Sequence, residues 1–145
     1  MNDFPITVRF PVHWSEMDAY GHVNNARYFT WFESARVAYF TRVGLVTPEM
    51  QRPENAVGPI VAATHAEYLR AVTFPADLVV GARVSRIGNT SFTMEYAVDD
   101  EKTGVRHARG GAVVVTLKYP EYTKVSVPHD VRLAMEQLEG RVFAG

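Results

Sequence analysis

The chain has 145 residues, of which 47% are hydrophobic, and its formal net charge is −1 at pH 7. This length is typical of one domain with a sizeable core, so we expect a single domain over residues 1–145. The near-neutral charge gives no reason to expect nucleic acid as a partner. The lack of cysteine excludes disulfides, a thiol nucleophile and thiolate metal ligands, and it suits a reducing compartment.

The N-terminal residues contain no basic segment followed by an apolar run, which argues against a secretory signal. No stretch of the sequence approaches the ~20 consecutive apolar residues of a membrane span. We therefore expect a cytoplasmic protein with no membrane insertion.

The first predicted strand covers residues 6–14, where apolar and polar side chains alternate. Pro11 has no backbone N–H to donate. We therefore expect this strand to lie at a sheet edge or to bulge near its end.

A long helix is predicted after Asn25. Its apolar residues recur at steps of three and four, the period of an α-helix, at Tyr28, Phe32, Ala35, Tyr39 and Val43. Phe29 and Phe40 widen this stripe, and a helix that is apolar around most of its circumference is usually buried against more than one surface. Asn24 or Asn25 is the expected N-cap, and Gly44 is the expected end of the helix.

The rest of the chain is predicted to be mainly strands. Residues 47–55 are expected to form a loop, with a helical turn at residues 48–51. Alternating or continuous apolar runs then predict strands at residues 57–69, 78–85, 92–98 and 105–119.

Glycine and proline mark the turns between these elements. Gly88-Asn89 predicts a hairpin turn, and Gly110-Gly111 suggests a bend or bulge inside the last strand. Pro128 opens a short C-terminal helix that Gly140 ends. This order gives an α+β plan in which the sheet must wrap the long helix, because nothing else in the chain can cover it.

Polar residues gather just before the predicted long helix. Asp18, His22, Asn24 and Asn25 lie in one short, turn-rich stretch. A helix start presents unpaired backbone N–H groups and about half a positive charge, so it favours anions and developing oxyanions. The alternative for Asp18 and Asn24 is a turn or capping role without chemistry.

The string from Asp18 to Tyr28 resembles the D-x-x-G-H-V-N-N-x-x-Y signature of hotdog-fold acyl-CoA thioesterases of the 4-hydroxybenzoyl-CoA thioesterase-like group. The resemblance continues through residues 67–70, Asp77 and residues 86–92 into the valine-rich last strand, and so covers about residues 6–119. Glu16 departs from the signature, because many relatives carry a second Asp two places before the catalytic one. That difference bears only on the local hydrogen bonding.

The resemblance implies a hotdog fold, in which a five-stranded antiparallel sheet wraps a long central helix, here followed by a short C-terminal helix. The implied reaction is hydrolysis of an acyl-CoA thioester to a free acid and coenzyme A. In it Asp18 is the general base or the nucleophile, the backbone N–H of Asn25 holds the oxyanion, and His22 orients the loop or touches the substrate. No cofactor is implied, since coenzyme A is part of the substrate.

Substrate-binding residues are expected on the helix and on the strands after it. Tyr28, Phe29 and Phe32 are candidates to line an acyl pocket, although core packing explains them equally well. Arg86 and Ser91, on either side of the Gly88-Asn89 turn, are candidates for coenzyme A binding. Other arginines could serve its phosphates or simply face solvent, namely Arg83, Arg106 and Arg109.

Two other functions stay open at this point. A hotdog hydratase or dehydratase would use Asp18 and His22 as its acid–base pair, but the D-x-x-x-H spacing differs from the D-x-x-x-x-H of that group. A non-catalytic protein that binds acyl thioesters is the third possibility. No two histidines have a spacing that suggests a metal pair, so no metal site is expected.

Assembly is expected because one sheet wrapped on one helix leaves a strand edge unpaired. Hotdog relatives pair two sheets edge to edge and build each active site from both chains. We therefore expect a homodimer or a homotetramer. The sequence does not specify the acyl group.

Overall fold

The computed structural model describes residues 1–47 and 56–144. The helical turn expected at residues 48–51, with most of the loop around it, lies outside these residues. The elements are β1 (Ile6–Pro11), a 3-10 helix η1 (Trp14–Glu16), α1 (Arg27–Val43), β2 (Val57–Tyr68), β3 (Asp77–Ile87), β4 (Ser91–Asp100), β5 (Arg106–Lys118), β6 (Thr123–Lys124) and α2 (His129–Glu139). None of the helices in the described ranges is both long and apolar enough to cross a membrane.

The strands form one antiparallel sheet in the order β1-β3-β4-β5-β2, and the short β6 pairs with the end of β5. This confirms the antiparallel sheet with a long helix and a short C-terminal helix, to which the structure adds β6. Pro11 is the last residue of the edge strand β1, as its missing N–H predicted. The strand was predicted to reach residue 14, but it ends at Pro11, and Trp14 begins η1.

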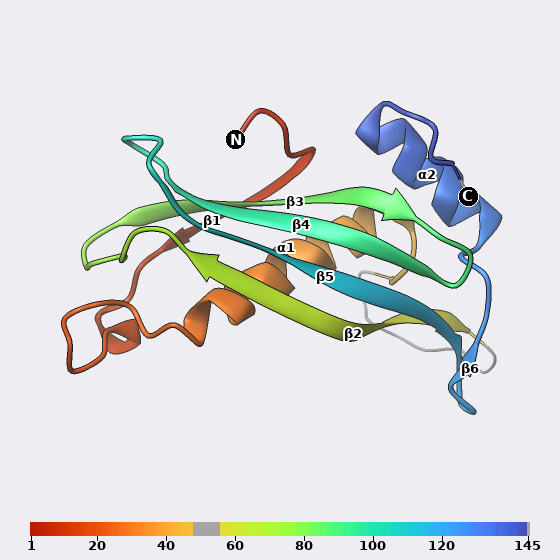
Figure 1. Cartoon of the computed structure of the whole chain (residues 1–145), viewed down its shortest axis with the longest axis horizontal. Coiled ribbons are helices and arrows are strands. Elements are labelled where there is room, and N and C mark those ends of the chain that lie inside the picture. The colour runs from red at the N-terminus through yellow and green to blue at the C-terminus, as the bar shows by residue number, and fades with distance from the viewer. Residues whose placement is uncertain (48–55, 145) are drawn as a thin grey trace.

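The helix α1 crosses one face of the sheet, behind the strands in Figure 1. Every residue of its predicted stripe is buried, namely Tyr28, Phe32, Ala35, Tyr39 and Val43. The helix ends at Val43, and Gly44 follows with a left-handed φ of 80°, as expected. Phe29 is 37% exposed, so its predicted place in the buried stripe was wrong. It lies about 100° around the helix from Tyr28 and so turns away from the buried side.

The helix also starts later than the sequence predicted. Arg27 is its first residue and Ala26 its N-cap, in place of Asn24 or Asn25. Asn24 nevertheless supports the start, because its side-chain Oδ1 accepts the N–H of Ala26 at 2.9 Å. The carbonyl oxygen of Asn24 accepts the N–H of Arg27 at 3.0 Å, so a tight turn leads directly into the helix.

A close approach between α1 and the sheet is possible at Gly110. The expected bend or bulge at Gly110-Gly111 is absent, and both residues keep register with β2 and β4. A Cβ atom at Gly110 would lie 2.7 Å from the ring of Phe32. The missing side chain lets this ring reach the strands, where it stacks on Tyr96 with the ring centroids 4.8 Å apart.

The short helix α2 closes the end of this layer, beside the end of β3 (Figure 1). It begins after Pro128 and ends before Gly140, as predicted. Oε2 of Glu139 accepts the Tyr39 hydroxyl at 2.6 Å and the N–H of Val84 at 2.8 Å. The β3–β4 register shifts just after Val84, and Glu139 supplies the acceptor for its N–H.

Replacing Glu139 by Ala would leave both of these donors unpaired. A buried donor without a partner costs about 1–3 kcal/mol, so we expect the free energy of unfolding to fall by about 2–4 kcal/mol in urea denaturation. Gln137→Ala, at an exposed position of the same helix, is the control and should change it by less than about 0.5 kcal/mol. Equal effects in the two variants would show that α2 is not held through Glu139.

Candidate functional site

A small hairpin precedes α1 and contains several of the predicted site residues. Met17 and Val23 form an antiparallel bridge, and the N–H of Asp18 donates to the carbonyl of His22 at 2.8 Å. Residues directly opposite each other lie on the same face of such a pair. Val23 is buried and Met17 packs against the core, so Asp18 and His22 lie on the opposite, outer face.

The turn of this hairpin uses one of the two carboxylate oxygens of Asp18. Its Oδ1 accepts the N–H of Tyr20 at 2.8 Å, and its carbonyl accepts the N–H of Gly21 at 3.2 Å. Gly21 has a φ of 81°, which a residue with a side chain rarely adopts. Oδ1 of Asp18 therefore has the turn role considered above, whereas Oδ2 accepts no hydrogen bond from any described residue.

Glu16 takes part in the lead-in to the hairpin. Its Oε1 accepts the N–H of His13 at 2.7 Å, and its carbonyl accepts the N–H of Asn24 at 2.9 Å. The side chain of Glu16, the residue that departs from the signature, thus caps the start of η1.

The backbone of Asn25 connects the hairpin to the start of α1. Its carbonyl accepts the Tyr68 hydroxyl at 2.9 Å. Its N–H donates to no acceptor among the described residues and lies at the positive end of the helix dipole. This N–H group is therefore available to a ligand oxygen.

A cavity of about 150 Å³ opens at this junction. His22, Asn25 and Tyr28 line it, together with Tyr68 and Arg70 from the end of β2 and the following loop. Burial raises the pKa of Tyr28 and of Tyr68, so both hydroxyls stay neutral near pH 7. Sequence reasoning did not choose Tyr68 or Arg70 as site residues, although both lie in the stretch 67–70 that carried part of the resemblance.

The other residues predicted to bind substrate do not line this cavity. Phe32 is fully buried in the core against Tyr96, and Phe29 is on the exposed side of α1. Arg86 and Ser91 flank the β3–β4 turn, at the opposite end of the sheet from the hairpin (Figure 1). Through β5 Ser91 is level with Ile60 of β2, roughly 25 Å along that strand from Tyr68.

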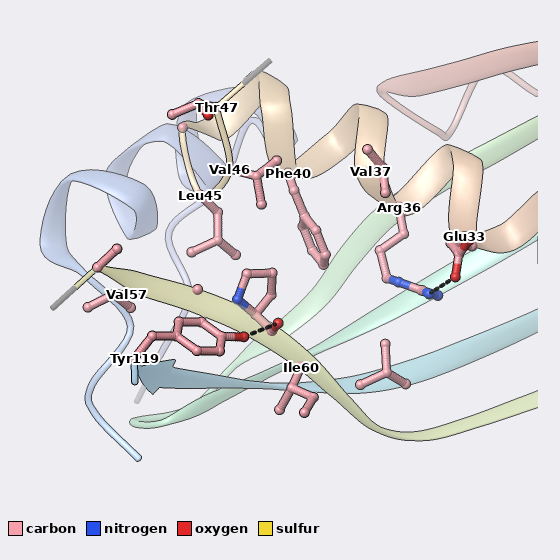
Figure 2. A pocket seen from close by; sticks show the side chains of 15 residues that line it. Glu33, Arg36, Val37, Phe40, Leu45, Val46, Thr47, Val57, Ile60 and Tyr119 are labelled. Carbon is pink, nitrogen blue, oxygen red and sulfur yellow. Dashed lines mark hydrogen bonds and ion pairs between the residues drawn. The ribbon is translucent and has the colours of Figure 1, made fainter. Parts of the chain in front are cut away.

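A second cavity, of about 570 Å³, lies at that distant end between α1 and the first half of β2. Its walls are mainly apolar and include Val37, Phe40, Leu45, Val57, Pro59, Ile60, Val61 and Tyr119, and Glu33 and Arg36 also line it (Figure 2). The sequence analysis did not single out this space, because it is formed by segments that are separate in the chain.

Most of the arginines considered for phosphate binding are already paired with carboxylates. Arg83 contacts Glu95 at 2.9 Å and Asp3 at 3.0 Å, Arg106 contacts Asp99 at 2.9 Å, and Arg109 contacts Glu67 at 3.0 Å. Arg86 is exposed and forms no ion pair with a described residue. Within the described ranges no cluster of three or more His, Asp or Glu could hold a metal ion.

Comparison with known sequences identifies a family. The sequence profile of the thioesterase-like superfamily matches residues 12–135, from the hairpin into α2. An uncharacterised protein of Bacillus subtilis strain 168, YsmA, is 32% identical over 91 residues. That match covers 63% of this chain and 56% of the relative, so it spans little more than half of that protein.

Solved structures with the same fold include thioesterases. One from Thermus thermophilus, solved in complex with coenzyme A and zinc, is 32% identical, with a TM-score of 0.83 over 97% of this chain and 98% of that chain. A thioesterase-superfamily protein from a Jannaschia species is 27% identical, with a TM-score of 0.85 over 95% of this chain and 85% of that chain.

The Glu67–Arg109 pair gives a test of which arginines are engaged. A hydrogen bond and the positive charge from Arg109 hold the pKa of the Glu67 carboxyl below its usual value. Arg109→Gln should therefore raise the pKa of Glu67, as followed by NMR titration of the side-chain carboxyl carbons. Arg86→Gln should leave it unchanged. No shift in the Arg109 variant would mean that this arginine is free to bind a phosphate.

Proposed function

The chain belongs to the thioesterase-like superfamily, and we propose that it hydrolyses an acyl-CoA thioester to a free acid and coenzyme A. The observation that carries the proposal is the unpaired N–H of Asn25 at the start of α1, next to a hairpin on which Asp18 keeps one free carboxylate oxygen. Thioester hydrolysis is promoted by a donor for the oxyanion and by a general base or nucleophile for the attack, and these two groups can supply them.

In the proposed reaction the thioester carbonyl oxygen accepts the N–H of Asn25. Asp18 takes a proton from water while the water oxygen bonds to the carbonyl carbon, and the resulting oxyanion is held at the helix start. Collapse of this intermediate breaks the C–S bond, and coenzyme A leaves as the thiol after taking up the proton. A second route has Asp18 attack the carbonyl carbon itself, which expels coenzyme A as the thiolate and forms a mixed anhydride. Water then hydrolyses the anhydride, which regenerates the carboxylate, and the proton released by the water protonates the thiolate.

The binding space for the acyl group is proposed to come from a second chain. The edge strand β2 is 12 residues long and has no strand on its outer side within the described part of the chain. Antiparallel pairing of two copies of β2 about a two-fold axis would set the Tyr68 end of one strand beside the Val57 end of the other. Each hairpin would then adjoin the 570 Å³ cavity of its partner. Such a dimer joins the chemical groups to a pocket large enough for an acyl chain.

The direct test is incubation with a panel of acyl-CoAs and a thiol reagent. Release of free thiol supports hydrolysis. Loss of absorbance from an enoyl thioester without thiol release would instead support a hydratase, and binding without either would support a non-catalytic protein.

Asp18→Asn separates chemistry from the turn role. The amide keeps the shape of the side chain and an oxygen for the N–H of Tyr20, so the variant should fold, assemble and bind acyl-CoA. It should turn over at least about 100-fold more slowly, because loss of a positioned base costs roughly 10²–10⁴ in rate. Steady-state thiol release measures this.

The matched control is Asp100→Asn. Asp100 also holds a turn, with its Oδ1 accepting the N–H groups of Lys102 and Thr103, but it lies outside the proposed site. Its activity should stay within about twofold of wild type, since only a turn is affected. Near-wild-type turnover in Asp18→Asn would refute the proposed role of Asp18.

Assembly is testable independently of turnover. If β2 pairs between copies, sedimentation velocity at micromolar concentration should give a dimer or a tetramer, because an exposed long edge strand favours pairing. A fully active monomer would rule out a site built from both chains.

A further inference from the structure

Among the described residues, a charged side chain reaches into the cavity between α1 and β2. Arg36 extends from α1 toward the strands, with its guanidinium beside Glu33 at the cavity wall (Figure 2). The Arg36 side chain is only 12% exposed, whereas that of Glu33 is 67% exposed. A buried cation therefore lies in a space that is otherwise mostly apolar.

The described residues satisfy this guanidinium only in part. Of its five N–H groups, one donates to the hydroxyl of Tyr96 at 3.3 Å. Nη2 lies 3.9 Å from Oε2 of Glu33, which is longer than a hydrogen bond. No fully buried polar side-chain atom in the described ranges lacks a partner, so the guanidinium nitrogens of Arg36 that make no hydrogen bond keep some exposure, on a side chain that lines the cavity.

Neither neighbour neutralises the charge of Arg36 well. Burial raises the pKa of Tyr96, so its hydroxyl is neutral near pH 7. The Glu33 carboxylate is mostly in water, where an ion pair at this separation is weak. A buried charge is costly unless it is paired and hydrogen-bonded, and a ligand anion in the cavity would meet that need.

We propose that Arg36 binds a carboxylate at the far end of the acyl group, so that the substrates are monothioesters of dicarboxylic acids. This inference rests on the proposed thioester hydrolysis and adds the substrate class. The guanidinium presents paired donors that match a carboxylate in two hydrogen bonds, which a neutral chain end cannot accept. The apolar wall from Val37, Phe40 and Ile60 contacts the methylene chain between the thioester and the carboxylate.

The neighbouring carboxylate of Glu33 should have the opposite effect on binding of a carboxylate-ended acyl group. It lies on the same side of α1, three residues from Arg36, and competes with the ligand for the guanidinium. Removing the negative charge of Glu33 should therefore strengthen binding of a carboxylate-ended acyl group, whereas removing the positive charge of Arg36 should weaken it.

The test compares acyl groups of equal length with and without the terminal carboxylate. The probes are adipoyl-CoA against hexanoyl-CoA and octanedioyl-CoA against octanoyl-CoA, with thiol release as the readout. Wild-type protein should favour the carboxylate-ended member of each pair by about 10–100-fold in kcat/KM, the range expected for a charge-assisted hydrogen bond. Arg36→Met should abolish the preference, because kcat/KM should fall far more for the carboxylate-ended member of each pair than for the neutral member. Glu33→Gln should lower KM for the carboxylate-ended probes only.

Arg42→Gln is the matched control, because Arg42 is exposed on the same helix and does not line the cavity. Thiol release without a preference, or an equal loss on both probes of a pair in Arg36→Met, would overturn the inference while leaving the proposed function intact. Dissociation of Arg36→Met into monomers in sedimentation would also overturn it, because the partner of Arg36 would then be the second subunit.

A binding measurement separates this inference from the proposed function. Calorimetric titration of Asp18→Asn with adipoyl-CoA and hexanoyl-CoA needs no turnover. Tighter binding of adipoyl-CoA together with no thiol release by wild type would sustain the role of Arg36 and refute hydrolysis. Equal dissociation constants would refute the role of Arg36.

Discussion

The close contact between Phe32 and Gly110 governs how the helix and the sheet fit together. A Cβ at Gly110 would overlap the Phe32 ring, so the glycine lets this ring approach the strand closely. The resulting stack of Phe32 on Tyr96 sets the height and direction of α1 over the strands. The helix whose position this contact helps to set carries the hairpin at its start and lines the larger cavity.

The groups proposed for chemistry are held mainly by backbone hydrogen bonds. The Met17–Val23 bridge fixes the hairpin, the Gly21 turn orients Asp18, and the carbonyl of Asn25 is tied to Tyr68 of β2. This arrangement leaves free the two groups that a thioester would need, the N–H of Asn25 and one oxygen of Asp18. A site held by main-chain contacts is already organised before substrate binds, so little ordering remains to oppose binding.

The two features proposed to be functional, the hairpin and the larger cavity, lie toward opposite ends of β2. The hairpin adjoins the Tyr68 end of β2, and the larger cavity adjoins the Val57 end. An edge strand paired about a two-fold axis brings such opposite ends of two copies together, which gives the unpaired edge of β2 a role in addition to assembly. Arg36 would then act on the part of the substrate farthest from the reacting carbonyl, and so on specificity.

Local features of the sequence were enough to predict the α+β plan, the long helix with its buried stripe, its end at Gly44 and the turn-rich stretch with Asp18. Each of these follows from periodicity, glycine and proline chemistry, or a contiguous motif. The sequence could not predict that Ala26 is the N-cap or that Gly110 keeps the strand register. It also could not predict that Arg83, Arg106 and Arg109 pair with carboxylates, or that Tyr68 lines the 150 Å³ cavity beside the hairpin. Those features depend on which side chains meet across strands that are distant in the chain. The burial of Arg36 is of the same kind, since its guanidinium meets Tyr96, a residue 60 positions away in the chain.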